Sequence, residues 1–415
     1  MIERPRGTRD FLPDDMERRR YYEGLLRGTA KTFGFREVAT PIFEEAELFI
    51  ARSGPNVLKE LYAFKDKGDR DIALRPEMTA AVIRMFVNEM SNDPKPLKLF
   101  YFGQCFRYER PQSGRYREFF QFGAELIGSA TPETDAEVIC MAASMIKALG
   151  LKEYKVRIGH IGVLRQRIAD AGVPQERAAE VLQKLDKKLY DEARPLMAGM
   201  GVSEDAMEDI FALTETVGGT EVLDRVPGDV GDYLRQVVGF LDAMGIVDIE
   251  IDLGVVRGLD YYTGMVFEAE APSLGAEKQI CGGGSYTLSE LFGGEKVFST
   301  GFAIGFDRIL LAMEKEGQVY EPKGIDAYVL SVSEDMRIKA AEVVAQLRAA
   351  DISADVDIMG RKMGKALKYA SAIKARYAII VGAKEMEDGC VTLRDMSTGE
   401  QELVKVDGLV TKIKV

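Results

Sequence analysis

Two stretches of alternating residues constrain the fold of this chain more than any other feature. Residues 97–109 alternate in polarity over 13 positions, and residues 119–128 alternate in the same way. This period of two is typical of β-strands whose two faces meet different surroundings. A loop rich in arginine, proline and glycine joins the stretches. We therefore predict an antiparallel hairpin.

The predicted hairpin has a polar face. Side chains two residues apart share a face, so Arg107 and Glu109 point the same way on the first strand. Phe119, Gln121 and Glu125 share a face of the second strand, and the connecting loop adds three more arginines. Burying such groups is costly unless they meet a ligand or each other. Because arginine forms bidentate hydrogen bonds with phosphate and stacks on bases, the cluster suits a nucleotide. The alternative is a surface hairpin whose charged groups pair with each other in salt bridges.

The other segments before residue 325 predict both helices and strands. Residues 71–74 read as a strand, and Pro76 suits the first position of a helix from Glu77 towards Glu89. Residues 160–245 have helical periodicity with 9 basic and 16 acidic residues, which predicts a helical insertion. Later strands are expected at 248–253, 265–271 and 297–302, and a helix at 306–316.

The C-terminal part predicts a separate domain. Residues 317–324 contain proline and glycines and suit a linker. Beyond them, strands and helices alternate in the βαβα manner of a small parallel α/β domain. The strands are expected at 327–332, 354–358 and 378–381, and the helices at 336–349 and 364–375. We therefore expect one domain over residues 1–324 and a second over residues 325–415.

The charge of the chain is unevenly distributed. A net charge of −12 argues against a protein that coats nucleic acid indiscriminately. Residues 325–415 nevertheless hold 14 basic and 14 acidic residues, and within them residues 361–376 hold six basic residues and no acidic one. This run favours either a local phosphate-binding surface or a solvated helix face.

Histidine and cysteine usage excludes several kinds of site. His160 is the only histidine in the sequence, so a triad with a histidine base and a multi-histidine metal site are excluded. The four cysteines lie far apart without a C-x-x-C pair, so we expect neither a disulfide framework nor a zinc knuckle. The chain has no membrane-length apolar run and its first residues do not resemble a secretory signal, so we expect a cytoplasmic location.

Two further clusters combine glycine with arginine. Residues 256–264 place neighbouring tyrosines between glycines, with Arg257 ahead of them. Residues 301–308 read as a strand that passes through small residues into a helix whose first turn carries Arg308. Glycines let a ligand approach the backbone, although core packing with a turn gives similar patterns. The second cluster is not G-x-G-x-x-G and the chain has no Walker sequence, so no Rossmann or P-loop site is predicted.

Taken together, these segments resemble the histidyl-tRNA synthetase family of class II aminoacyl-tRNA synthetases. Two of them are similar to the second and third class II signature motifs: residues 107–111 and 301–308. Two others are similar to the histidine-specific motifs: residues 257–262 and 282–286. With residues 6–13, residues 74–79 and the C-terminal segment, the resemblance covers nearly the whole chain.

The resemblance implies an α+β catalytic domain on an antiparallel sheet, with a helical insertion near the tRNA acceptor stem and a C-terminal α/β anticodon-binding domain. It implies a homodimeric ATP-dependent ligase that activates L-histidine as histidyl-adenylate and transfers histidine to tRNA(His), releasing AMP and diphosphate. Mg²⁺ is expected with the ATP phosphates, because the chain offers no dedicated metal cage. Gln112 would approach the first base pair of the tRNA.

The resemblance also assigns residues to the two small substrates. Histidine would be bound by Glu77, Met78, Thr79, Gln121, Glu125, Arg257, Tyr261, Tyr262 and Tyr286. ATP would be bound by Arg107, Glu109, Arg115, Phe119 and Arg308. Within these sets, Glu125 and Tyr262 would bond the two imidazole nitrogens. Arg107 and Arg257 would be the catalytic pair, which grips the α-phosphate and the reacting carboxylate.

Elementary chemistry agrees with these roles. Attack of a carboxylate on the α-phosphate brings two anions together, so fixed positive charge and alignment lower the barrier without a protein nucleophile. An imidazole has a polar atom at each end of a flat ring. An acceptor and a hydroxyl on opposite sides of that ring therefore select it over aliphatic side chains.

The sequence departs from the family pattern at three positions. Ser285 and Thr287 stand where the family often has arginine and aspartate, and Phe120 replaces a common histidine. Alternation turns Phe120 away from the polar face, so its effect on the site is discounted. The departures at Ser285 and Thr287 bear on the geometry near Tyr286.

Two other functions are compatible with parts of the resemblance. One is a catalytically silent relative that senses histidine and regulates the first enzyme of histidine synthesis. Such relatives generally lack the anticodon-binding domain and have degraded ATP motifs, whereas both are intact here. The other is a synthetase for a different amino acid, against which Glu125 and Tyr262 argue.

Overall fold

The computed structural model describes residues 2–53, 55–109, 114–186, 188–226, 228–255 and 262–414. The chain forms two compact units, residues 1–320 and residues 321–415. Arg257, Tyr261 and Gln112, which the sequence assigns to the site, lie outside the described residues. In the described ranges, no helix has the length and apolar character that crossing a membrane requires.

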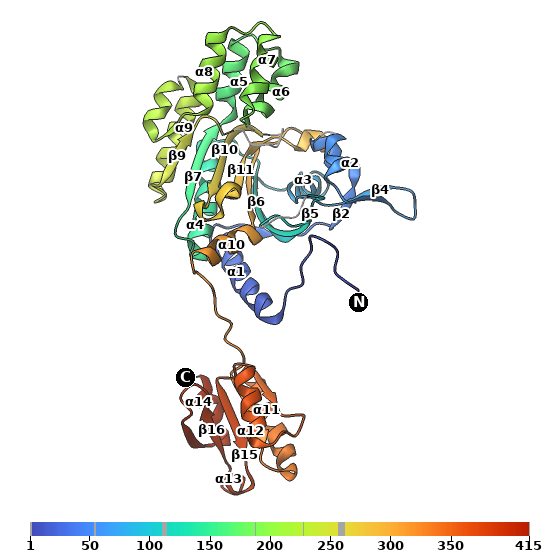
Figure 1. The fold of residues 1–415 in the computed structure, drawn as a ribbon, viewed down its shortest axis with the longest axis vertical. Helices are drawn as coiled ribbons and strands as arrows, with labels where there is room; N and C mark the ends of the chain where they lie inside the picture. Colours follow the sequence, from blue (N-terminus) through green and yellow to red (C-terminus); the bar gives the residue numbers. More distant parts are fainter. Residues whose placement is uncertain are drawn as a thin grey trace. The chain divides into compact units, whose positions relative to one another are not determined.

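A nine-stranded sheet is the centre of the first unit (Figure 1). Its order is β1 (Arg36–Glu37), β5 (Leu97–Phe106), β6 (Glu118–Ile127), β12 (Ser299–Gly305), β11 (Gln279–Tyr286), β10 (Tyr262–Glu270), β7 (Lys155–His160), β9 (Ile249–Asp252) and β8 (Val217–Gly218). The strands from β5 to β7 are all antiparallel, and parallel pairs occur where β1 joins β5 and where β9 joins β7. This sheet confirms the expected fold class.

The predicted hairpin is confirmed as β5 and β6. The two strands are in antiparallel register, with Leu99 opposite Glu125 and Cys105 opposite Phe119. The first strand ends at Phe106, three residues before the predicted end at residue 109. It ends there because the chain diverges from β6: the Tyr108 N–H donates to the Glu60 carbonyl at 2.8 Å.

Helices cover one face of this sheet. α4 (Pro132–Leu149) lies across it beside α1 (Pro13–Thr32), and α10 (Phe306–Lys315) follows β12 directly. Phe122, Ala124 and Leu126 alternate along β6 and belong to the core under these helices. The residues between them on β6 therefore point to the opposite face.

The opposite face carries a smaller layer. It contains α3 (Thr79–Met85) continued by a π-helix (Phe86–Met90), α2 (Ala46–Ser53) and a 3-10 helix (Pro55–Lys59). It also contains a three-stranded sheet of β2 (Phe43–Glu45), β4 (Asp71–Leu74) and β3 (Ala63–Lys65). The strand expected at residues 71–74 is confirmed. The helix predicted from Glu77 was wrong at its start, because the Glu77 carboxylate accepts from the Ala80 N–H at 3.2 Å and so precedes the first turn.

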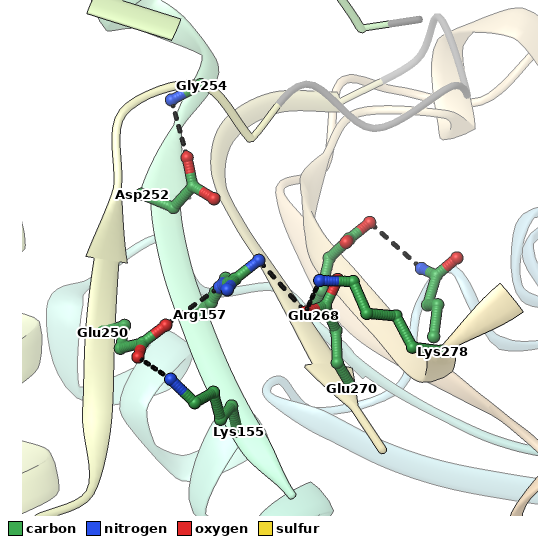
Figure 2. Close-up of polar contacts among 9 residues, drawn as sticks. Lys155, Arg157, Glu250, Asp252, Gly254, Glu268, Glu270 and Lys278 are labelled. Atoms are coloured by element: carbon green, nitrogen blue, oxygen red, sulfur yellow. Dashed lines mark hydrogen bonds and ion pairs between the residues drawn. The ribbon is translucent and has the colours of Figure 1, made fainter. Parts of the chain in front are cut away.

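The helical insertion is confirmed between β7 and β9. Its helices are α5 (Ile161–Asp170), α6 (Gln175–Asp186), α7 (Tyr190–Ala198), α8 (Glu204–Thr214), a 3-10 helix (Thr220–Arg225) and α9 (Asp229–Ala243), with the short strand β8 between α8 and the 3-10 helix. A series of ion pairs links β9, the strand that follows the insertion, to the rest of the sheet (Figure 2). Arg157 on β7 pairs with Glu250 on β9 and with Glu270 on β10, both at 3.0 Å. Lys155 also pairs with Glu250, and Lys278 pairs with Glu270 at 2.7 Å.

The second unit has a five-stranded sheet of order β14-β13-β15-β16-β17. Along the chain it contains β13 (Ala327–Ser331), α11 (Arg337–Ala349), β14 (Ala354–Val356), α12 (Met363–Ala372), β15 (Tyr377–Val381), α13 (Ala383–Glu387), β16 (Cys390–Asp395), β17 (Gln401–Lys405) and α14 (Leu409–Lys414). The three expected strands are parallel, but β16 and β17 are antiparallel and were not predicted. A tight turn reverses the chain there, with Asp395 accepting from the Ser397 and Thr398 N–H groups.

The glycine-rich segment forms the interior of β11, which the sequence did not reveal as a strand. With glycine at three successive positions, no side chains alternate to signal the strand. A Cβ added at Gly283 would lie 2.6 Å from the Phe267 ring and closer still to the Gly301 carbonyl. The neighbouring strands therefore require glycine at this point.

We expect Gly283→Ala to destabilise the protein by about 1–3 kcal/mol, because the added methyl group has no room. Gly239→Ala is the matched control: Gly239 is exposed in α9 and a Cβ there meets nothing within 4 Å. That change should stabilise the protein by about 0.5–1 kcal/mol through helix propensity. Urea unfolding of both variants measures the difference, and equal stability of the two would contradict the packing argument.

Candidate active site

A cavity of about 240 Å³ lies on the face of the large sheet opposite α4. Eleven of the predicted side chains line it, from segments far apart in the sequence: Glu77, Thr79, Arg107, Glu109, Arg115, Phe119, Gln121, Glu125, Tyr262, Tyr286 and Arg308. Met78 is not among the lining residues; it is buried in the core between α3 and the sheet. The structure thus brings together most of what the sequence assigned to one site.

Glu125 is the most deeply buried charged group of the cavity wall, with 1% of its surface exposed. Tyr101 on β5 donates its hydroxyl to one carboxylate oxygen at 2.7 Å, and Tyr286 on β11 donates to the other. Burial raises the pKa of Glu125 to about 7, although the two hydroxyl donors oppose the shift. The carboxyl group therefore titrates near neutral pH, where it can accept or donate a hydrogen bond.

The absence of a side chain at Gly301 makes this arrangement possible. Gly301 on β12 pairs directly with Glu125, and β12 lies between β6 and β11. A Cβ at Gly301 would overlap the Glu125 carboxylate. Because glycine leaves the space open, the hydroxyl of Tyr286 reaches across one strand to Glu125.

Tyr101 is a site residue that the sequence reasoning missed. Its hydroxyl joins Glu125 to the Thr79 hydroxyl, which lies 3.1 Å away. It was missed because a tyrosine between Phe100 and Phe102 reads as core packing. Its position in the sequence could have indicated it, because Tyr101 lies an even number of residues before Arg107 and therefore shares its face of the strand.

The Glu77 carboxylate adds negative charge to the same end of the cavity. Glu77 is buried, and its proximity also raises the pKa of Glu125. Two acidic groups and the hydroxyls of Thr79, Tyr101 and Tyr286 converge there. This end suits a ligand that carries a cation and a polar ring.

Arginines occupy the other end of the cavity. Arg107 donates to the Pro76 carbonyl at 3.0 Å and lies 5.2 Å from the Phe119 ring, and Arg308 donates to the Gln279 carbonyl at 2.8 Å. Arg115 lies 3.5 Å from the Glu109 carboxylate. Arg107 also lies 3.9 Å from the Glu109 carboxylate. Three guanidinium groups at one end of the cavity supply positive charge that suits a phosphate. The cavity is therefore electrically polarised from one end to the other.

Two positions that departed from the expected pattern have their own packing and hydrogen-bond partners. The Ser285 hydroxyl donates to the buried Asp135 carboxylate at 2.8 Å, and Tyr233 from the insertion donates to the same group at 2.7 Å. The Phe120 ring packs against Phe11 and Phe102. Phe120 is nevertheless among the residues that line the cavity, although alternation predicted that it would point away. The structure gives no account of Thr287.

His160 has a structural role. Its Nδ1 accepts from the Gly162 N–H at 3.0 Å and caps the first turn of α5. Burial lowers its pKa to about 4, so the ring is neutral at physiological pH. It is not one of the residues that line the cavity.

We expect Glu125→Gln to be more stable than the native chain at pH 8 and close to it at pH 5. Because the folded-state pKa is raised to about 7, the native chain loses stability as pH rises from about 4.5 to 7, whereas glutamine does not titrate. The gain at pH 8 is at most on the order of 3 kcal/mol. Thermal unfolding at the two pH values measures it; a gain that is larger at pH 5 would refute the burial argument.

Comparison with known proteins agrees with this geometry. The family model for histidyl-tRNA synthetase matches residues 7–309, and that for an anticodon binding domain matches residues 326–415. A histidine–tRNA ligase of Archaeoglobus fulgidus is 47% identical over 413 residues, which cover 98% of each chain. The apo histidyl-tRNA synthetase of S. aureus is 32% identical with a TM-score of 0.75 over the full length of both chains.

A further solved structure is described as an ATP phosphoribosyltransferase regulatory subunit/histidyl-tRNA synthetase from Bacillus halodurans. It is 25% identical, covers 92% of this chain and 99% of its own, and has a TM-score of 0.79. One family model spans most of the chain, and a relative of nearly half identical sequence matches almost end to end. The chain therefore belongs to the histidyl-tRNA synthetase family.

Proposed function

We propose that this cavity binds L-histidine at its acidic end and ATP at its arginine-rich end. The protein is an ATP-dependent aminoacyl-tRNA ligase: it forms histidyl-adenylate and transfers histidine to tRNA(His), releasing AMP and diphosphate. The observation that carries the proposal is the buried Glu125 carboxyl group, which is held by two tyrosine hydroxyls and lines the same cavity as three arginines.

The acidic end fits the three polar groups of histidine. Glu77, Thr79 and Gln121 bind the ammonium group, because a carboxylate with two neutral acceptors matches its three donors. Glu125 and Tyr262 bond the two nitrogens of the ring. Tyr286 encloses the ring together with Tyr261, and Met78 supports this wall from the core.

The arginine-rich end fits ATP. Glu109, Phe119 and Arg308 frame the adenine, and Arg115 reaches the terminal phosphates. Arg107 and Arg257 stabilise the reacting groups as a bond forms between the histidine carboxylate oxygen and the α-phosphorus, while the bond to the diphosphate oxygen breaks. Fixed positive charge is the main requirement of this step, since both reactants are anions.

Mg²⁺ accompanies the ATP in this proposal. The described residues contain no group of three or more acidic, histidine or cysteine side chains that could hold a metal ion. Phosphate oxygens and water would therefore supply most of the ligands, which suits a cation that keeps much of its hydration. The ion would neutralise phosphate charge.

The remaining parts of the chain are assigned to tRNA and assembly. Residues 325–415 bind the anticodon arm, the insertion lies near the acceptor stem, and Gln112 approaches the first base pair. The catalytic domain extends over residues 1–324. We further propose a cytoplasmic homodimer, as the family implies.

Pyrophosphate exchange tests the activity directly. With histidine and ATP, we expect the purified protein to exchange labelled pyrophosphate into ATP, and no exchange with other amino acids at the same concentration. Histidine binding without exchange would instead support a regulatory histidine sensor; the Bacillus halodurans protein is described in part as a regulatory subunit. Exchange with another amino acid would reassign the specificity.

Glu125→Ala tests the histidine pocket. We expect at least a hundredfold loss of kcat/KM for histidine, because a site built to hydrogen-bond the ring loses its buried acceptor. ATP affinity should change by less than about threefold, since the phosphate end is untouched. Glu118→Ala on the same strand, outside the cavity lining, is the matched control. An unchanged preference for histidine in Glu125→Ala would count against the assignment.

A further inference from the structure

The N-terminal segment of residues 7–11 packs against the loop of the hairpin. The Arg117 N–H donates to the Gly7 carbonyl at 2.9 Å. The Arg9 guanidinium lies 3.4 Å from the centre of the Tyr116 ring, a close stacking contact. Tyr116 and Arg115 both line the cavity, whereas Arg9 does not. The segment thus contacts residues of the loop that line the cavity, but from outside the cavity.

Asp307 joins the same segment to two other walls of the cavity. One of its carboxylate oxygens lies 2.7 Å from Arg9 Nη2 and 2.7 Å from Arg19 Nη1. The other oxygen accepts from the Phe120 N–H at 2.7 Å. Asp307 precedes Arg308, and Phe120 follows Phe119. A single buried carboxylate therefore connects the N-terminal segment, α1, β6 and α10 at the ATP end.

The two arginines differ in what they contribute to this carboxylate. Arg19 is buried on α1 among the rings of Phe11, Phe120 and Phe306, where it helps to build the core. Arg9 is about one-quarter exposed, at 23%, and reaches out to Tyr116. If Arg9 is replaced, Asp307 retains a charged partner in Arg19. Loss of Arg9 should therefore release the loop without unfolding the domain.

We infer that residues 7–11 form a strap that sets the shape of the ATP end, and that Arg9 is a positioning residue for the loop carrying Tyr116 and Arg115. The strap acts from outside the cavity, through Tyr116 and Asp307, which line it. This inference rests on the proposed assignment of that end to ATP. The physical reason is preorganisation: a loop already held in its binding position costs less to order when ATP binds.

Arg9→Gln and Arg9→Lys test the strap, with Arg6→Gln as the control. Arg6 is exposed and lies three residues before Arg9. Arg6→Gln changes the net charge by the same amount as Arg9→Gln. In pyrophosphate exchange we expect Arg9→Gln to raise KM for ATP at least tenfold, with KM for histidine within twofold of native. Arg9→Lys should give a smaller rise, since lysine keeps the charge but cannot stack as a planar fork. Arg6→Gln should match the native protein.

A double-variant comparison separates positioning from general stability. Because Arg9 is inferred to act through Tyr116, adding Arg9→Gln to Tyr116→Leu should change KM for ATP much less than adding it to the native chain. The inference is overturned if Arg9→Gln and Arg9→Lys leave KM for ATP unchanged, or if both substrates are affected equally. It is also overturned if the two changes are additive. Absence of histidine-dependent exchange in the native protein would instead refute the proposed function, and the strap with it.

Discussion

The burial of the Glu125 carboxyl group is the constraint on which the structure of the cavity depends. A carboxylate removed from water must receive hydrogen bonds, and here both donors are tyrosines from other strands. One of them, Tyr286, reaches Glu125 only because Gly301 leaves the intervening strand bare. The register of four strands is thereby tied to one acidic group. A register shift of one residue in any of these strands would move that strand's side chains to the other face of the sheet.

The polarisation of the cavity follows from this centre. Acidic groups and hydroxyls gather around Glu125, while arginines gather where β6, α10 and the hairpin loop meet. The two ends suit the two small substrates of the proposed reaction, an amino acid with an ammonium group and a polyanion. Two buried carboxylates support the two ends: Asp135 joins β11 to the insertion, and Asp307 joins the N-terminal segment to the walls around Arg308.

Elements with a strong local pattern could be predicted from the sequence, and elements without one could not. The hairpin, the strand at residues 71–74 and the helical insertion have clear periodicity, and each is present. The strand β11 was missed because glycines carry no side chains to alternate. The start of α3 was misplaced because the Glu77 side chain accepts from the Ala80 N–H, so Glu77 lies before the helix and not in its first turn. Tyr101 was missed because its role depends on its hydrogen bond to Glu125 on the neighbouring strand β6.

The sequence by itself determined which chemical groups are available and how they are spaced along each strand or helix, because local periodicity is a property of neighbouring residues. It placed Arg107, Gln121 and Glu125 on shared faces and excluded histidine-based chemistry. Only the tertiary structure decided which faces meet. The hydroxyl that Tyr286 offers to Glu125 comes from 161 positions further along the chain, and the Arg9 contact to Asp307 joins the first segment to a helix near the end of the first unit. Such pairings arise from sheet order and packing, which local spacing does not encode.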